Sequence, residues 1–160
     1  MGARNNMLLA FEKLLARTTG QPSLPRAAET DHRLDVSVIF TSDQATVAAL
    51  KGAGAMAGPL GVRITLVVPQ TVPFPLPLNS PPVLLDFSER RFSEIAAATS
   101  VETRVCLYLC RDRLETLCNV LPRRSPVLLG GRKRWWPTAE KKLARQLRRA
   151  GFEVIYTEME

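Results

Sequence analysis

The hydrophobic positions of this chain follow two alternating patterns from residue 34 onward. Short, continuous apolar runs end at turn-forming residues, and the longer stretches between them carry apolar residues at helical spacing. Continuous apolar runs are typical of strands that are buried on both faces of a parallel sheet. The pattern predicts strands at residues 34–40, 62–68, 101–110, 126–129 and 153–157.

The helical stretches between these runs carry their own start and stop signals. Asp112 is placed to cap a helix, with Glu115 three residues later as in a capping box. Pro137 suits a first helical turn, and Gly151 a helix end. The proline-rich stretch 69–82 predicts an extended surface loop. Alternation of strands and helices predicts a doubly wound α/β domain with a five-stranded, mostly parallel sheet. The predicted helices cover residues 43–57, 83–98, 112–121 and 137–150.

The first 33 residues have a different pattern. Asn5 or Asn6 is placed to cap a short helix that runs to about Arg17, and residues 18–33 resemble a linker. We therefore expect an N-terminal helix and linker at residues 1–33 and the α/β domain at residues 34–160. The helix would serve as a dimer contact, as a docking site for a protein partner, as a peripheral membrane element, or as a part packed on its own domain. Its apolar stripe is Met7, Leu8, Phe11, Leu14 and Leu15.

Composition excludes several classes of protein. The chain has 160 residues, of which 46% are hydrophobic and 23% charged, which suits one folded domain. No apolar run approaches the roughly 20 residues of a membrane-spanning helix, and no signal-peptide pattern is present. Cys106, Cys110 and Cys118 resemble small buried residues, and the single histidine, His32, falls in the linker. We expect a cytoplasmic domain with no metal site and no catalytic residues.

The positive charge is concentrated near the C-terminus. Residues 132–149 contain eight Lys or Arg residues and one acid, Glu140, so this segment accounts for the whole net charge of +7. Such a face attracts phosphates, nucleic acid or an anionic membrane surface. No nucleic-acid reader motif accompanies the cations, so we expect no nucleic-acid partner and only peripheral membrane contact. A solvated helix face is the simplest interpretation.

The segment Gly130–Thr138 carries the most informative chemistry. It follows the fourth predicted strand and leads into a helix N-terminus, where anions bind readily in open α/β sheets. Its composition predicts an anion or nucleotide pocket, because tryptophan rings also stack on bases. We favour the alternative of a turn at Gly131, packed tryptophans and solvated cations, because no phosphate-binding fingerprint is complete. The segment contains Arg132, Lys133, Arg134, Trp135 and Trp136.

Several stretches of the chain resemble the universal stress protein family. Val36–Phe40 and the small-residue run to Gly61 resemble the first strand and helix of that family, and Arg63–Pro69 resembles its second strand. Val101–Val105, the helix from Asp112, and Pro126–Gly130 resemble the part from the third strand to the fourth. The likeness covers residues 34 to about 131 and implies a Rossmann-like sheet of the adenine nucleotide alpha hydrolase type.

The resemblance implies an ATP site at the carboxyl ends of the strands and a homodimer formed through the last strand. Thr41 stands where the family has an aspartate, with Asp43 two residues later, and only Gly130 fits the family's phosphate-binding glycine loop. We therefore expect no tightly bound cofactor, with ATP as the ligand to test. A ligand would bind near Thr41, Ser42, Asp43, Gly130, Gly131 and Arg132, where the first and fourth strands end side by side.

These observations predict a non-catalytic regulatory or interaction domain like a universal stress protein, acting as a homodimer. Two alternatives stay open. One is a nucleotide-binding domain or weak nucleotide hydrolase that uses Arg132, Lys133 and Arg134 in place of the glycine loop. The other is binding to nucleic acid or membrane through the basic C-terminal helix.

Overall fold

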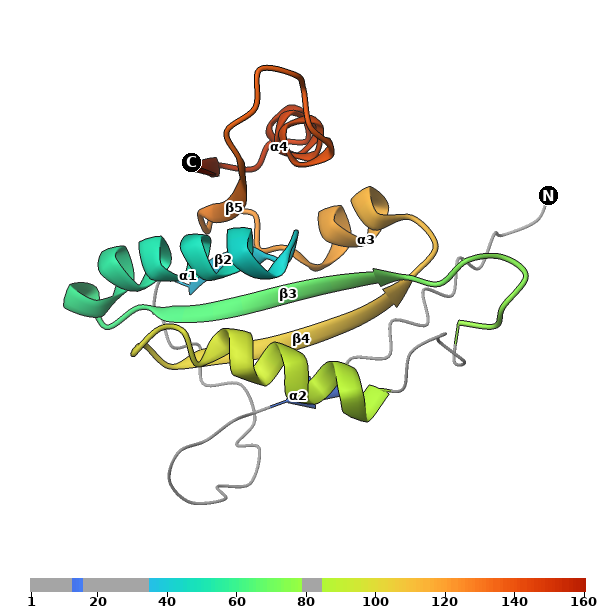
Figure 1. The fold of residues 1–160 in the computed structure, drawn as a ribbon, viewed down its shortest axis with the longest axis horizontal. Coiled ribbons are helices and arrows are strands. Elements are labelled where there is room, and N and C mark those ends of the chain that lie inside the picture. The colour runs from blue at the N-terminus through green and yellow to red at the C-terminus, as the bar shows by residue number, and fades with distance from the viewer. Residues whose placement is uncertain (1–12, 16–34, 79–84) are drawn as a thin grey trace.

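The computed structural model describes residues 13–15, 35–78 and 85–160 (Figure 1). The strands are β1 (Lys13–Leu15), β2 (Asp35–Ile39), β3 (Arg63–Thr71), β4 (Thr103–Cys110), β5 (Val127–Arg132) and β6 (Val154–Met159). The helices are α1 (Asp43–Ala57), a 3₁₀ turn (Gly58–Leu60), α2 (Leu85–Ala96), α3 (Arg113–Val120) and α4 (Ala139–Arg149). In these ranges no helix has both the length and the apolar character needed to cross a membrane.

The strands form one sheet in the order β1-β4-β3-β2-β5-β6. Strands β2 to β6 are parallel, and β1 pairs antiparallel with β4 at one edge. From β2 the chain proceeds outward to β4 and then crosses back to β5 and β6 on the other side of β2. The strand order therefore reverses between β2 and β5, and the predicted doubly wound sheet of five parallel strands is confirmed.

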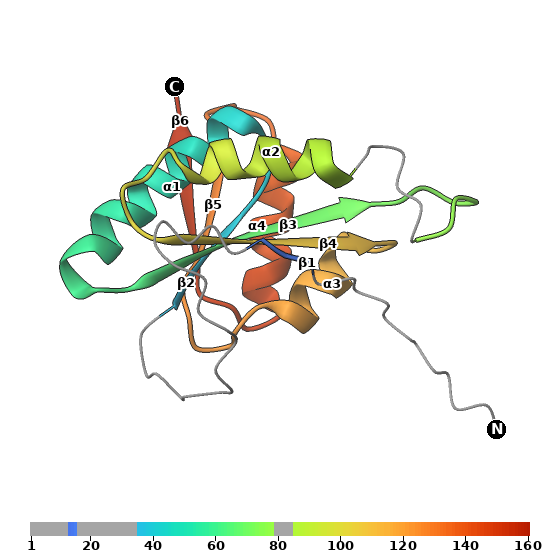
Figure 2. The same ribbon diagram turned by 90° about the horizontal axis from the view of Figure 1, so that it is seen from below.

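Helices cover both faces of the sheet, as Figure 2 shows from the edge. Helices α1 and α2 enclose one half of the core, and α3 and α4 enclose the other. Successive strand residues serve opposite faces, so Val38 packs towards α1 and α2 while Ile39 packs towards α3 and α4. Both side chains are fully buried, which explains the continuous apolar run in the sequence.

The N-terminal helix prediction is wrong for residues 13–15. These residues form β1, in which Lys13 pairs with Leu107 and Leu15 with Val105. Without β1, strand β4 would present an unpaired row of backbone groups, and pairing along that edge outweighs a local helical pattern. The rest of the predicted helix and linker lies outside the described residues, and the division of the chain at residue 34 stays a prediction.

Strand β3 extends into the proline-rich stretch that was expected to be a loop. Its pairing with β2 ends at Val67, whereas its pairing with β4 continues to Thr71. The Val67 carbonyl accepts a hydrogen bond from the N–H of Phe40, the residue directly after β2. Backbone groups alternate along a strand, so those of Pro69 also point towards β2, at a position beyond the end of that strand. The missing N–H of Pro69 therefore costs no sheet hydrogen bond, which is why proline is tolerated there.

Three described helices begin at a side-chain cap, and each cap accepts a hydrogen bond from a backbone N–H three residues later. Ser42 caps α1 at 3.4 Å, Asp112 caps α3 at 2.9 Å and Thr138 caps α4 at 3.3 Å. The Asp112 cap is confirmed. Pro137 precedes the Thr138 cap instead of lying in the first turn of α4, because the threonine hydroxyl satisfies an N–H of that turn.

Candidate functional site at the ends of strands β2 and β5

The predicted site residues come from two neighbouring strands, β2 and β5, where the strand order reverses. The residues after β2 lie beside the end of β5, and the Thr41 hydroxyl donates a hydrogen bond of 2.8 Å to the Gly130 carbonyl. Ser42 caps α1 and Asp43 opens its first turn. The structure therefore places the two predicted groups of residues next to each other.

The hydrogen bond between Thr41 and Gly130 joins the end of β2 to β5. The Thr41 N–H donates to the Thr46 hydroxyl at 3.1 Å, so both polar groups of Thr41 that face α1 and β5 have protein partners. A Cβ atom on Gly130 would lie 2.0 Å from the Ala45 carbonyl oxygen, which shows how closely β5 passes the first turn of α1. The Thr41 N–H and the Gly130 carbonyl are therefore engaged in internal contacts, and neither is left to contact a ligand at these strand ends.

Asp43 points to a different neighbour. Its carboxylate forms an ion pair of 2.5 Å with Arg91 of α2, and both side chains are about half exposed. Arg91 also lies over the Phe40 ring, 5.6 Å from its centroid. Asp43 therefore links α1 to α2 instead of facing β5.

Gly130 and Gly131 do not begin a loop, contrary to the prediction. They belong to β5, which pairs with β6 as far as Arg132, and the Lys133 N–H donates to the Met159 carbonyl at 2.7 Å. A Cβ atom on Gly131 would meet the Tyr156 hydroxyl at 1.8 Å. Close packing explains both glycines, because Gly130 lies against α1 and Gly131 lies against Tyr156. The two glycines continue β5 beyond Leu129, where the apolar pattern had predicted its end.

Arg113 also contributes to this edge, and the only signal in the sequence was its position directly after the Asp112 cap. Its guanidinium donates to the Phe40 carbonyl at the end of β2, at 2.6 Å. Burial lowers the pKa of Arg113, while the charges of Cys110 and Glu140 oppose that shift. Arginine still stays protonated near neutral pH, so Arg113 closes the end of β2 from the α3 side as a cation.

Cys110 lies near the same edge and is not set up as a nucleophile. Burial is the main cause that raises the pKa of its thiol, and hydrogen bonds with Thr116 and Thr71 act in the opposite direction. A thiol with a raised pKa is protonated at neutral pH and reacts slowly. Cys106 and Cys110 are both buried, as predicted, and neither is part of a disulfide bond. Among the residues that the structure describes, no cluster of His, Cys, Asp and Glu suits a metal ion.

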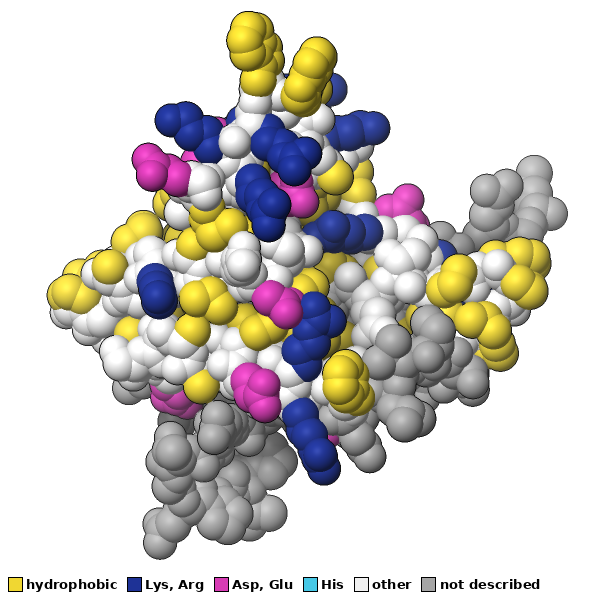
Figure 3. Space-filling model, in the orientation of Figure 1, with side chains coloured by type: hydrophobic (Ala, Val, Ile, Leu, Met, Phe, Trp, Pro, Cys, Tyr) yellow, Lys and Arg dark blue, Asp and Glu magenta, His cyan; other side chains and the backbone are white. Residues whose placement is uncertain are grey.

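Beyond β5 the chain forms an exposed loop, Lys133–Pro137, before the Thr138 cap of α4. Trp135 is 96% exposed and Trp136 is 76% exposed, so neither packs on the described part of the domain. Figure 3 shows two large hydrophobic side chains projecting from this end of the molecule, with Lys and Arg side chains around their base. Arg132, at the end of β5, contacts Gln44 at 3.5 Å.

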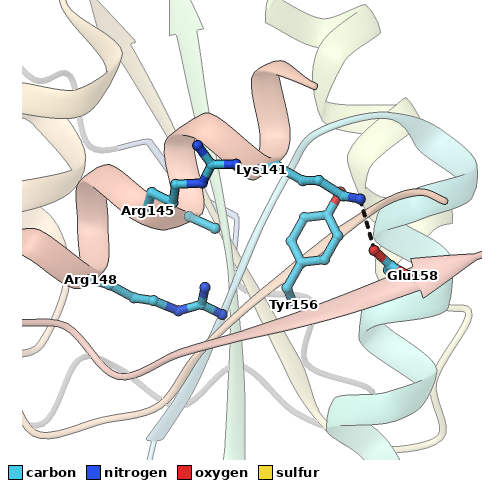
Figure 4. Close-up of a pocket in the computed structure, with 6 residues that line it drawn as sticks. Lys141, Arg145, Arg148, Tyr156 and Glu158 are labelled. Carbon is cyan, nitrogen blue, oxygen red and sulfur yellow. Dashed lines mark ion pairs between the residues drawn. The ribbon is translucent and has the colours of Figure 1, made fainter. Parts of the chain in front are cut away.

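A basic hollow of about 270 Å³ lies between α4 and β6 (Figure 4). Lys141 forms an ion pair of 2.9 Å with Glu158 and also donates to the Arg134 carbonyl at 3.0 Å. Arg148 donates to the Val154 carbonyl from Nε at 3.3 Å and from Nη2 at 3.0 Å. Two of the cations that line this hollow are thus committed to contacts within the domain. The lining residues are Lys141, Ala144, Arg145, Arg148, Tyr156 and Glu158.

Neither a protein-family model nor a curated protein matches this sequence. Among solved structures, a protein from the universal stress protein family from Burkholderia pseudomallei superposes with a TM-score of 0.56 at 22% identity, over 79% of this chain and 96% of that one. The chain has the fold of the universal stress proteins. A universal stress protein in complex with cAMP gives a TM-score of 0.49 at 13% identity, over 80% of this chain and 98% of that one. A universal stress protein from Archaeoglobus fulgidus gives a TM-score of 0.49 at 17% sequence identity, over 77% of this chain and 92% of that one.

Within this universal stress protein fold, the exposed charged and aromatic side chains lie at a different place from the one that the sequence predicted. The predicted residues Thr41 and Gly130 lie side by side, but their polar groups form a hydrogen bond with each other instead of facing an open site. The exposed cations and rings lie further along, from Arg132 to Trp136. The candidate site thus has a closed inner part at the strand ends and an open outer part on the loop.

Proposed function

We propose that this domain is a non-catalytic regulatory or interaction module rather than a tight nucleotide carrier. The observation that carries this proposal is the hydrogen bond between the Thr41 hydroxyl and the Gly130 carbonyl. It lies at the reversal of strand order, outside the carboxyl ends of the strands, where open α/β sheets bind their ligands. A crevice whose walls are bonded to each other offers few free groups to a phosphate.

An interaction role also agrees with the surface. In the described part of the chain, four large apolar side chains are more than two-thirds exposed, and they lie on loops and turns. Exposed aromatic side chains frequently become the central contacts of an interface. These side chains are Leu60, Phe74, Trp135 and Trp136.

Calorimetric titration with ATP, with and without magnesium, tests the proposal. We expect no saturable heat up to millimolar nucleotide. Saturable binding that is lost in Arg132→Ala and kept in Lys51→Ala would overturn it, because Lys51 is an exposed cation on α1 and serves as the matched control. That outcome would establish the nucleotide-binding alternative, which the exposed cations Arg132, Lys133 and Arg134 next to the closed edge favour.

We further propose that the domain forms a homodimer through the outer edge of β6. The Glu153 carbonyl faces β5, and the Val154 carbonyl faces away and accepts from Arg148. Backbone groups alternate along a strand, so those of Tyr156 and Glu158 also face outward, where a second β6 can pair with them.

The variant Glu158→Pro removes one outward N–H and spares the bonds between β5 and β6. We expect it to shift the protein from dimer to monomer in sedimentation velocity. Glu158→Gln, which keeps the N–H and loses the charge, is expected to stay dimeric. Wild-type protein that sediments as a monomer, or a dimer that survives the proline, would dismiss this interface.

A further inference from the structure

The loop between β5 and α4 ends in an aromatic tip formed by Trp135 and Trp136. The two residues are adjacent, and their exposed fractions of 96% and 76% mean that the described part of the domain covers little of either ring. Apolar rings left this open on a folded domain are a mark of a binding surface. The tip is directly preceded by Arg132, Lys133 and Arg134.

Helix α4 adds a basic face next to this tip. Its inward face is formed by Leu143, Ala144 and Leu147, which are buried in the core. The helical period turns three of its cations, Lys142, Arg145 and Arg149, away from the core and leaves them exposed or lining an open hollow. Lys141 and Arg148 instead reach across to β6, where they contact Glu158 and the Val154 carbonyl.

A second hollow connects the tip with the basic face. It measures about 340 Å³ and opens beside Pro137, the residue that follows the tryptophans. Its lining includes three cations and no carboxylate. A phosphate group in this hollow would meet charges that no acid in the lining neutralises. The three cations are Lys142, Arg145 and Arg149.

We propose that this end of the domain binds the surface of an anionic lipid bilayer. Trp135 and Trp136 enter the interfacial region, and Lys142, Arg145 and Arg149 contact headgroup phosphates. Tryptophan is enriched at membrane–water interfaces, and each Lys or Arg near an anionic leaflet adds attraction. This assignment rests on the interaction role proposed above and names its partner.

The geometry favours a bilayer over a nucleic acid. A bilayer can take up two adjacent exposed rings, while cations beside them in the chain and on α4 stay at the level of the headgroups. Figure 3 shows two hydrophobic side chains that project above a group of Lys and Arg side chains. Proteins that bind single strands instead line a groove with aromatic residues, so that successive bases stack along it. The hollow beside Pro137 has three cations but no aromatic residue in its lining.

The test uses the full chain and vesicles of phosphatidylcholine, either pure or with about one-third phosphatidylglycerol. The chain contains two tryptophans, so its intrinsic tryptophan fluorescence reports on this tip and on no other place. We expect co-sedimentation with the anionic vesicles, a blue shift of the emission, and weakening of both by salt.

Variants assign the binding to the tip and the hollow. Trp135→Ala with Trp136→Ala is expected to weaken co-sedimentation at least tenfold. Each of Lys142→Ala, Arg145→Ala and Arg149→Ala is expected to weaken it about fivefold. Met56→Ala and Lys51→Ala are the matched controls, because they remove a partly exposed apolar side chain and a cation from α1 and should leave binding unchanged.

Three results would overturn the proposal. They are the absence of binding to anionic vesicles at low salt, binding without a change in tryptophan emission, and full binding by the double tryptophan variant. A single-stranded oligonucleotide that quenches the emission while vesicles do not would assign the surface to nucleic acid instead. If the vesicle experiment fails, only the bilayer is excluded as the partner, and the proposed interaction role is still tested by the ATP titration. Saturable ATP binding would overturn the proposed interaction role whether or not the protein binds vesicles.

Discussion

Gly130 and Trp135 are five residues apart in the sequence, yet one is tightly packed and the other is open to solvent. Gly130 accepts a hydrogen bond from Thr41 and lies against the backbone of Ala45, whereas Trp135 is almost fully exposed. The inner position is where a sheet of this topology offers a ligand site, and here the polar groups of Thr41 and Gly130 bond to each other. The comparison teaches that fold topology locates a site without showing that it is open, and that the accessible chemistry here lies on the outer loop.

The largest expected effect comes from adding one methyl group at the inner position. In Gly130→Ala the new Cβ would lie 2.0 Å from the Ala45 carbonyl oxygen, and both atoms belong to the packed interior. We expect the free energy of unfolding to fall by about 3 kcal/mol, as for a strongly overpacked core site. Guanidinium denaturation followed by circular dichroism measures this change.

Gly52→Ala is the matched control for that variant. Gly52 lies within α1, and a Cβ there would meet no atom within 4 Å. Alanine suits a helix better than glycine, so this variant should gain roughly 0.5 to 1 kcal/mol. Equal stability of the two alanine variants would mean that the inner position is not closed, and the comparison with the outer loop would fail.

The smallest expected effect lies at the outer position. The double change of Trp135 and Trp136 to alanine removes rings that the described domain hardly contacts, so the free energy of unfolding should move by less than about 0.5 kcal/mol. The same denaturation experiment measures it. A loss of 2 kcal/mol or more, the scale of a buried ring, would show that the tryptophans serve the fold and would remove the basis of the membrane proposal.

The sequence predicted most of the fold because its local signals agree with the tertiary structure. The strand cores around Val38 and Leu128 are apolar on both faces, and Asp112 caps its helix through its own side chain. The predicted α1 has the same bounds, Asp43–Ala57, as the helix observed. These features depend on neighbours in the sequence, which is why they could be inferred from it.

The features that the sequence missed depend on partners far away in the chain. Strand β1 exists because β4 offers an edge about 90 residues later, and Gly131 continues β5 because Tyr156 fills the space above it. The role of Arg113 depends on a carbonyl of β2. The sequence therefore predicted that Thr41 and Gly130 lie next to each other, while the hydrogen bond between them could be seen only in three dimensions. That a ligand binds there stays a prediction.

Strand β1 makes the two sides of the described sheet unequal. It covers the middle of β4 as an edge strand of only three residues, whereas β6 ends the other side with six residues and outward backbone groups. Very short edge strands give a second chain little backbone to pair with. Under the dimer proposed above, β1 therefore disfavours the addition of further copies at the opposite edge, which would otherwise extend the pair into a fibre.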